Sequence, residues 1–73
     1  MKISDLNFEF TGCCGGEASA KVVHENGLMT QVYQSDDGTY AAVTYAGGAI
    51  YRPIQTGMSD ADAELRIAAD AAI

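Results

Sequence analysis

The sequence predicts an α+β fold, an antiparallel β-meander of four to five strands with one C-terminal α-helix packed on one face. Three tight-turn signals separate β-prone runs, namely Asn26-Gly27, Asp36-Asp37-Gly38 and Gly47-Gly48. Hairpins in series of this kind make a meander. After Pro53 the alternating pattern gives way to an alanine-rich segment, in which Ser59 is a good N-cap three residues ahead of an acid. The last segment is therefore expected to be a helix.

The chain has 73 residues, which is room for a single domain, residues 1–73, with a marginal hydrophobic core. The expected strands span about 3–11, 18–25, 28–35, 39–46 and 49–54. The expected helix spans about 60–72. A glycine-rich loop that contains the adjacent residues Cys13 and Cys14 joins the first two strands.

The two faces of the predicted sheet follow from the assumption that every hairpin has a two-residue loop. The side chains expected on the core face are Val23, Leu28, Val32, Val43, Tyr45, Ile50 and Ile54. The helical stripe expected to pack over them is Ala61, Leu65, Ala68 and Ala72. Asp62, Arg66 and Asp70 stand four residues apart on a polar flank of the helix, where weak ion pairs are expected.

The opposite face of the predicted sheet has no second helix to cover it. The side chains expected on this opposite face are Val22, His24, Met29, Gln31, Tyr33, Tyr40, Thr44 and Tyr51. Tyrosine offers a large contact area and a polar tip, so Tyr33, Tyr40 and Tyr51 are candidate partner-binding residues. The alternative is an ordinary solvated face on which Tyr and Thr occur because strands favour them. A register shift of one residue would exchange the two faces.

Ile67 is the helix residue that does not fit the predicted stripe. It falls almost opposite Leu65, and Ala63 and Ala71 flank it, so it is expected to form a small apolar patch on the outward side. Such a patch is a candidate contact with a second copy of the chain or with a target. The alternative is a lone exposed isoleucine, which is common on protein surfaces.

The composition favours a basic protein partner. Ten Asp and Glu against four Lys and Arg give a net charge of −6, which repels phosphate backbones and anionic lipid. Direct nucleic-acid binding and membrane binding are therefore not expected. Because the sequence shows no signal segment or membrane span, we expect a cytoplasmic location. The candidate contact acids are Asp36, Asp37, Asp60, Asp62 and Glu64. Their alternative role is structural, at a hairpin tip and in the first turn of a helix.

Catalytic, metal and cofactor sites are not expected. Cys13, Cys14 and His24 do not supply the four ligands and spacing of a closed zinc site. His24 has no neighbour in sequence that would mark a nucleophile and an orienting group. A thiol or shared-metal function at Cys13-Cys14 remains an alternative. The other interpretation is two free thiols in a loop.

The whole chain resembles a group of small phage proteins in its format. It begins Met1-Lys2-Ile3, is short and acidic, and combines a tight-turned meander with a helical segment from Ser59 to Ile73 that is rich in Ala and Asp. These features resemble the phage-encoded inhibitors of host defence, and among them the anti-CRISPR proteins. The resemblance implies stoichiometric inhibition in the host cytoplasm, by blocking a basic surface of a CRISPR effector complex. It assigns no site residue, because the group shares no motif.

The function expected from the sequence is therefore a non-catalytic protein-binding module, and in its narrower form a phage-type inhibitor. A small structural protein that forms a homodimer is the alternative, through a sheet edge, the tyrosine face or Ile67.

Overall fold

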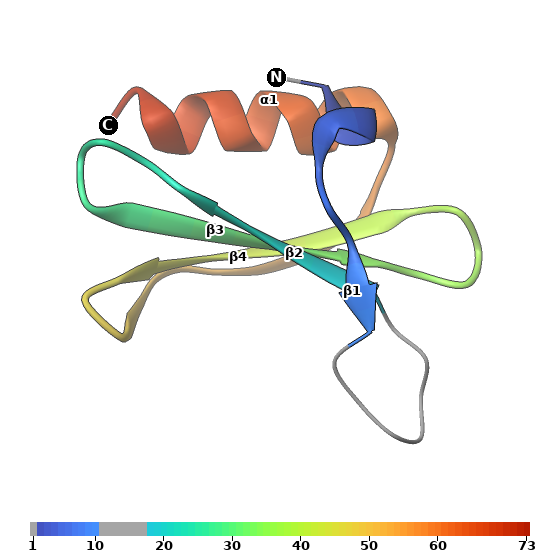
Figure 1. The fold of residues 1–73 in the computed structure, drawn as a ribbon, viewed down its shortest axis with the longest axis horizontal. Coiled ribbons are helices and arrows are strands. Elements are labelled where there is room, and N and C mark those ends of the chain that lie inside the picture. The colour runs from blue at the N-terminus through green and yellow to red at the C-terminus, as the bar shows by residue number, and fades with distance from the viewer. Residues whose placement is uncertain (1, 11–17) are drawn as a thin grey trace.

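The computed structural model describes residues 2–10 and 18–73 of the chain. Helix α1 lies across one face of a five-stranded antiparallel sheet, whose strand order is β1-β2-β3-β4-β5 (Figure 1). The elements are η1 (Ile3–Asp5), β1 (Glu9–Phe10), β2 (Ala18–Val23), β3 (Leu28–Gln34), β4 (Tyr40–Ala46), β5 (Ala49–Met58) and α1 (Asp60–Ala71). The predicted α+β meander with one C-terminal helix is confirmed.

The first predicted strand, 3–11, is wrong over most of its length. Within the described part of this range, 3–10, the strand is confined to Glu9–Phe10, and Ile3–Asp5 forms a short 3-10 helix instead. The side chain of Ile3 is buried in the core, and its N–H donates to Glu64 Oε2 of α1 at 2.7 Å. The beginning of the chain is therefore attached to the helix rather than to the sheet edge. The loop that contains Cys13 and Cys14 lies outside the described residues.

The turn between β2 and β3 has three residues, not the two that the sequence analysis assumed. His24 N donates to Leu28 O at 2.8 Å, so these two residues close the hairpin around residues 25–27. Gly27 ends the turn at φ 90°, a conformation that glycine adopts without strain. The side chain of Asn26 stabilises the turn, because its Oδ1 accepts the N–H of Leu28 at 3.0 Å.

The turn between β3 and β4 repeats this arrangement. Ser35 N donates to Thr39 O at 3.0 Å, Gly38 has φ 85°, and Asp37 Oδ1 accepts the N–H of Thr39 at 3.0 Å. In both turns an Asn or Asp before the glycine occupies the extra position. The third turn, Gly47-Gly48, has the predicted two residues, since Ala46 pairs with Ala49.

The extra residue in the first two turns exchanges the predicted faces of β2 and β4. Val22 and Ala42 lie in the hydrophobic core, whereas Val23 is 77% exposed. Leu28 and Val32 are buried as predicted. The predicted core positions of Val23 and Tyr45 are therefore wrong. Val43 is buried as expected, at 4% exposure, but on the face of the sheet away from α1.

Strand β5 follows the exchanged face of β4 and adds irregularities of its own. Ile50 keeps its predicted pairing with Tyr45, so it turns with Tyr45 to the face away from α1 and is 65% exposed. Farther along, the pairing with β4 shifts register between Tyr40/Ala42, Ala42/Thr44 and Thr44/Tyr45, and Ile54, also expected in the core, is 57% exposed. Pro53 fits an edge strand, because its missing N–H costs no ladder bond there.

Helix α1 begins as predicted but buries a different face. Ser59 is its N-cap and accepts the N–H of Asp62 at 3.2 Å. The buried side chains of the helix are Ala63, Arg66, Ile67 and Asp70. Leu65, predicted to face the core, is 67% exposed, and Ile67, predicted to face outward, is 3% exposed. The side chain of Asn26 donates to Asp70 O at 2.8 Å and to Ile73 O at 3.0 Å, which ties the β2–β3 turn to the helix C-terminus.

The hydrophobic core lies between α1, η1 and one face of the sheet. Its buried members are Ile3, Val22, Val32, Ala42, Met58, Ala63 and Ile67, with Leu6, Phe8 and Tyr40 packed against them. These side chains are few and small, which is consistent with the expectation of a marginal core. Within the described part of the chain, no helix has the length and apolar character that crossing a membrane requires.

Replacing Ile67 distinguishes the observed helix face from the predicted one. Ile67→Ala should lower the free energy of unfolding by about 2 to 5 kcal/mol, because it leaves a cavity in the core. Leu65→Ala should change it by less than about 0.5 kcal/mol, since Leu65 is exposed. Urea unfolding followed by circular dichroism measures both values. The opposite order of the two losses would mean that the helix is rotated.

Candidate functional site

A cluster of charged and polar side chains is buried between α1 and the sheet. Asp70 is at its centre and is 0% exposed. Its Oδ2 accepts hydrogen bonds from Thr30 Oγ1 at 2.7 Å and from Thr44 Oγ1 at 2.6 Å, and its Oδ1 accepts one from Arg52 Nη1 at 2.8 Å. Three strands therefore supply donors to one carboxylate of the helix. We call the residues Asp70, Arg66, Thr30, Thr44, Arg52 and His24 the buried polar cluster.

Arg66 completes the charge balance of the cluster one helical turn before Asp70. Its Nη2 donates to Thr44 Oγ1 at 2.9 Å, and its Nη1 donates to Gln55 Oε1 at 3.2 Å. Its Nε lies 3.5 Å from Asp70 Oδ2 and is buried without a hydrogen bond. The expected i,i+4 ion pair between Arg66 and Asp70 forms, but it is buried against the sheet and does not lie on a polar flank of the helix. The rotation of α1 that buries Ile67 also buries both of these charges.

The direction of the hydrogen bonds around Thr30 fixes the tautomer of His24. The single hydroxyl proton of Thr30 is donated to Asp70, so Thr30 Oγ1 must accept from His24 Nε2, which lies 2.8 Å away. The same reasoning makes Thr44 a donor to Asp70 and an acceptor from Arg66. Each hydroxyl therefore directs its proton to the Asp70 carboxylate, and both threonine side chains are buried.

The buried polar cluster keeps Asp70 ionised. Burial raises the pKa of the Asp70 carboxyl, but the hydrogen bonds from Thr44, Thr30 and Arg52 and the charge of Arg66 together outweigh it. The pKa of Asp70 is therefore lowered from the usual value of 3.8. A buried carboxylate with this set of donors holds α1 in one position on the sheet.

The candidate contact acids lie mainly at one end of the molecule. Asp36 and Asp37 are exposed at the β3–β4 turn, and Asp60 and Asp62 are exposed in the first turn of α1. Figure 1 shows that turn and the start of the helix toward the same end. The bonds that Thr39 donates to Asp37 lower the pKa of that carboxyl. Glu64 is half-buried and accepts the N–H of Ile3, so it has a structural contact of its own.

The structure does not bring the three candidate tyrosines together. Tyr33 pairs with Ser19 and Ala41 on the face of the sheet away from α1. Tyr40 lies on the helix side, where its ring centroid is 6.0 Å from that of Phe8. Tyr51 is exposed on β5, between the register shifts. The predicted single tyrosine face is wrong, and Ile67 is a core residue rather than a surface contact.

A different set of side chains forms an exposed row on the face away from α1. Val23 pairs with Met29, Met29 with Tyr45, and Tyr45 with Ile50. Directly paired residues point to the same face of a sheet, so these four form one line across β2 to β5. We call them the apolar row. Val23 is 77% and Ile50 65% exposed, and Met29 and Tyr45 are half-buried.

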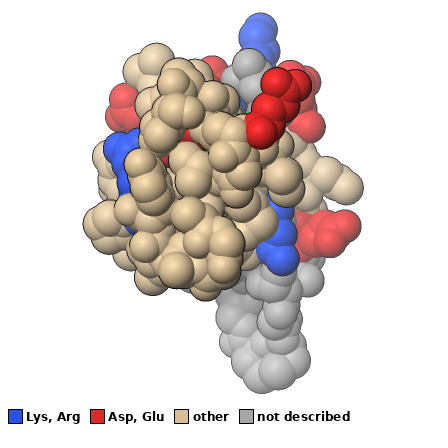
Figure 2. All heavy atoms as spheres, turned by 90° about the vertical axis from the view of Figure 1, so that its left-hand side faces the viewer, with Lys and Arg blue, Asp and Glu red and all other residues tan. Residues whose placement is uncertain are grey.

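The apolar row adjoins a shallow hollow of about 310 Å³ beside the two turns at this end. Its lining residues are Lys21, Gly27, Met29, Gln31, Tyr45, Gly47 and Gly48. Figure 2 shows that most of the surface at this end of the molecule belongs to uncharged residues. Lys21 is the charged residue of the hollow. Sequence reasoning missed the row because it assumed two-residue turns.

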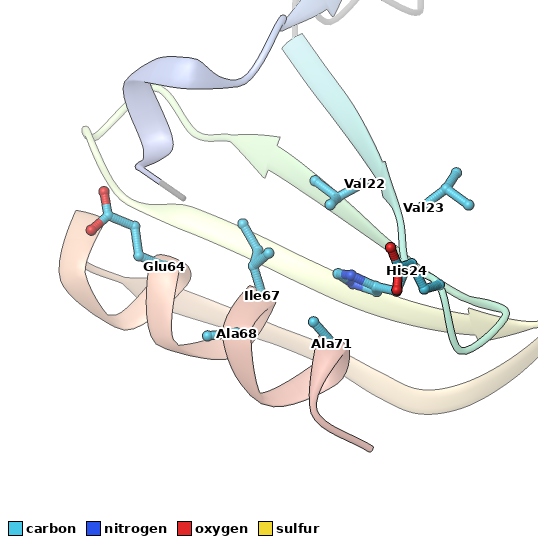
Figure 3. Close-up of a pocket in the computed structure, with 8 residues that line it drawn as sticks. Val22, Val23, His24, Glu64, Ile67, Ala68 and Ala71 are labelled. Carbon is cyan, nitrogen blue, oxygen red and sulfur yellow. The ribbon is translucent and has the colours of Figure 1, made fainter.

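A second hollow, of about 360 Å³, separates the end of β2 from α1 (Figure 3). Its lining residues are Val22, Val23, His24, Glu25, Glu64, Ile67, Ala68 and Ala71, and we call it the β2–α1 groove. Val22 and Ile67 point toward each other across it, while Val23 points away (Figure 3). The groove is therefore lined mostly by apolar side chains together with His24, and each of its two walls carries one glutamate, Glu25 or Glu64.

The described residues 2–10 and 18–73 contain no group of three or more His, Cys, Asp or Glu placed to hold a metal ion. Cys13 and Cys14 lie outside these ranges. Comparisons with protein-family models, with curated proteins and with solved structures found no match to this chain.

Removing the carboxylate of the buried polar cluster should destabilise the fold strongly. Asp70→Asn leaves Arg66 buried without its counter-charge, which we expect to cost about 3 to 5 kcal/mol of unfolding free energy. Asp60→Asn changes an exposed acid in the same helix and should cost about 1 kcal/mol or less. Equal losses, measured by urea unfolding at pH 7, would show that the cluster does not hold the helix.

The lowered pKa of Asp70 predicts an acid-sensitive stability. Because the folded state has the lower pKa, the contribution of Asp70 is complete above its unfolded value near 3.8. It is lost as the pH falls through the folded pKa. Thermal unfolding between pH 7 and pH 2 should therefore show a smaller acid-induced loss in Asp70→Asn than in the natural chain.

Asp37→Asn is the control for this pH dependence. The pKa of Asp37 is also lowered, but its bonds to Thr39 are exposed to solvent and contribute little. Its loss of stability in acid should stay close to that of the natural chain. An unchanged acid loss in Asp70→Asn would contradict the assignment of the pKa shift to the folded cluster.

Proposed function

We propose that the chain is a non-catalytic protein-binding module that contacts its partner with the apolar row. The observation that carries the proposal is the line of paired side chains from Val23 to Ile50, at an end of the molecule where most of the surface belongs to uncharged residues. Exposed apolar side chains that are contiguous mark interaction surfaces more often than isolated ones do. Tyr45 and Met29 are residue types that interfaces favour.

The use of polar groups inside the fold supports a binding role over catalysis. His24, Thr30, Thr44 and Asp70 are the side chains with catalytic potential that the structure brings together, and all are buried and hydrogen-bonded to one another. Their arrangement places a hydroxyl between the imidazole and the carboxylate. In a Ser-His-Asp triad the imidazole takes the middle position, between the nucleophile and the acid. The cluster therefore favours a structural role.

The narrower proposal is that the partner belongs to a host defence system and that the chain is an inhibitor of the anti-CRISPR type. Its support is the format of the sequence, which is small and acidic with a net charge of −6. The acids at the β3–β4 turn and at the start of α1 would then contact a basic surface of an effector complex. Binding through the acidic end and binding through the apolar row should respond differently to salt. Salt weakens contacts between exposed charges, so it should lower the affinity of the acidic end for a partner and leave that of the apolar row largely unchanged.

Substitutions that separate the apolar row from the rest of the surface test the proposal. Ile50→Asp should lower partner capture from an extract of the host cell by about tenfold or more, because an isoleucine contact contributes about 1.5 to 3 kcal/mol. Leu65→Asp is the matched control, as Leu65 is exposed to a similar degree on the other side of the molecule. Quantitative mass spectrometry of the captured proteins gives the ratio, and thermal unfolding verifies that both variants fold.

Two further outcomes decide between the surfaces. Capture that survives Ile50→Asp but is lost in Asp36→Lys/Asp37→Lys and in high salt would overturn the apolar row and favour the acidic end. Equal loss in Ile50→Asp and Leu65→Asp would contradict a specific role for the row.

A further inference from the structure

Among the residues that the structure describes, the outer edge of β2 has main-chain groups with no pairing strand. Hydrogen-bonded pairs alternate along an antiparallel ladder, and His24 with Leu28 is such a pair. The register then makes Val22 with Thr30 the next bonded pair. Lys21 and Val23 lie at the alternate positions, so their N–H and C=O groups point away from β3.

Strand β1 covers only the first part of this edge. Glu9 pairs with Ser19 and Phe10 with Ala18. Ser19, Lys21 and Val23 are alternate residues of β2, so their main-chain N–H and C=O groups point to the same side of the strand. Preceding β1, the chain leads away from the edge to η1, which bonds to α1 through Ile3 and Glu64. None of the residues in the described ranges pairs with Lys21 or Val23 on that side. Two N–H and two C=O groups are thus available to another strand.

The open edge borders the β2–α1 groove. Val22 points into this groove and Val23 points to the opposite face, where it begins the apolar row (Figure 3). A strand added beside β2 would alternate in the same way. Its residue opposite Val22 would lie over Ile67 and Ala68, and its residue opposite Val23 would extend the apolar row.

We propose that the β2 edge and the β2–α1 groove together bind an extended segment of a partner protein, added as a strand antiparallel to β2. The segment has an apolar side chain opposite Val22 and Lys or Arg at neighbouring groove-facing positions. This mode of recognition takes affinity from main-chain hydrogen bonds and specificity from alternate side chains. The inference rests on the proposed protein-binding function and names the chemistry of the partner.

Charge selects this occupant over a second copy of the chain. Glu25 and Glu64 stand on the two walls of the groove, and the chain as a whole carries −6. A basic segment would place its ammonium or guanidinium groups near these carboxyls. Pairing two β2 edges would instead bring two sets of groove acids together.

A synthetic probe tests the proposal without knowledge of the natural partner. The probe is a fluorescein-labelled, end-blocked peptide, Thr-Lys-Thr-Val-Thr-Lys, whose Lys and Val side chains share one face of a strand. N-methylation of its third and fifth residues removes the N–H groups that would bond Lys21 and Val23. N-methylation of its second and fourth residues blocks N–H groups that point to solvent. Fluorescence anisotropy should show about a tenfold loss of affinity or more for the first peptide and little change for the second.

The side chains of the groove provide the second arm of the test. Glu25→Gln and Glu64→Gln should each weaken binding of the probe several-fold, and a peptide with Glu in place of Lys should not bind. Glu64→Gln retains an acceptor for the N–H of Ile3, so the fold should be preserved. Leu65→Ala should leave probe binding unchanged, because Leu65 is exposed and does not line the groove. The probe and the groove variants test the β2 edge, whereas Ile50→Asp in partner capture tests the apolar row, so the two failures are distinguishable.

Three results would overturn the proposal. One is absence of binding by the unmodified probe at millimolar concentration. Another is equal affinity for the two N-methylated peptides, which would mean that the main chain of the probe does not pair with β2. The last is a concentration-dependent dimer in sedimentation that the probe dissociates, which would make a second copy the occupant of the edge.

Discussion

A buried carboxylate decides how the helix sits on the sheet. Asp70 is removed from water, and the donors that compensate it come from Thr30, Thr44 and Arg52 on three neighbouring strands. Slipping β3 or β4 by one residue would turn a threonine hydroxyl to the other face and leave Asp70 short of a partner. We infer that the cluster selects one register and one rotation of α1, at a cost in stability that an apolar contact would not have.

The same constraint determines which surfaces remain for binding. His24, Arg66 and both threonines are used to hold α1, and the small apolar core beneath the helix occupies the rest of that sheet face. The acids Asp36, Asp37, Asp60 and Asp62 gather toward one end, and the apolar row lies toward the other. A partner can therefore reach the row and the β2 edge without contacting Asp70, whereas in the groove it would meet His24 of the buried polar cluster.

The order of elements was predictable from the sequence, whereas the faces were not. Glycine-containing turns and the cap at Ser59 are local signals, and they indicated the hairpins and the helix correctly. The register depended on whether Asn26 and Asp37 sit in two- or three-residue turns, which short sequence patterns do not distinguish. On the helix, the apolar side chain of Leu65 led to the prediction that Leu65 faces the core. The face that is buried instead contains Arg66, Asp70 and Ile67. The four-residue spacing of Arg66 and Asp70 predicted an ion pair. Their burial was not predictable, because it depends on hydrogen bonds with Thr30 and Thr44, which are distant in the sequence.

Amide hydrogen exchange along β2, measured residue by residue by NMR on the free chain, tests the register and the open edge most directly. The amides of Ala20 and Val22 should be protected, because the register bonds them to β3. The amides of Lys21 and Val23 should exchange with little protection. The reverse alternation would mean that the two-residue turn is correct after all, and uniform protection of all four would mean that the edge is covered; either result would contradict the account.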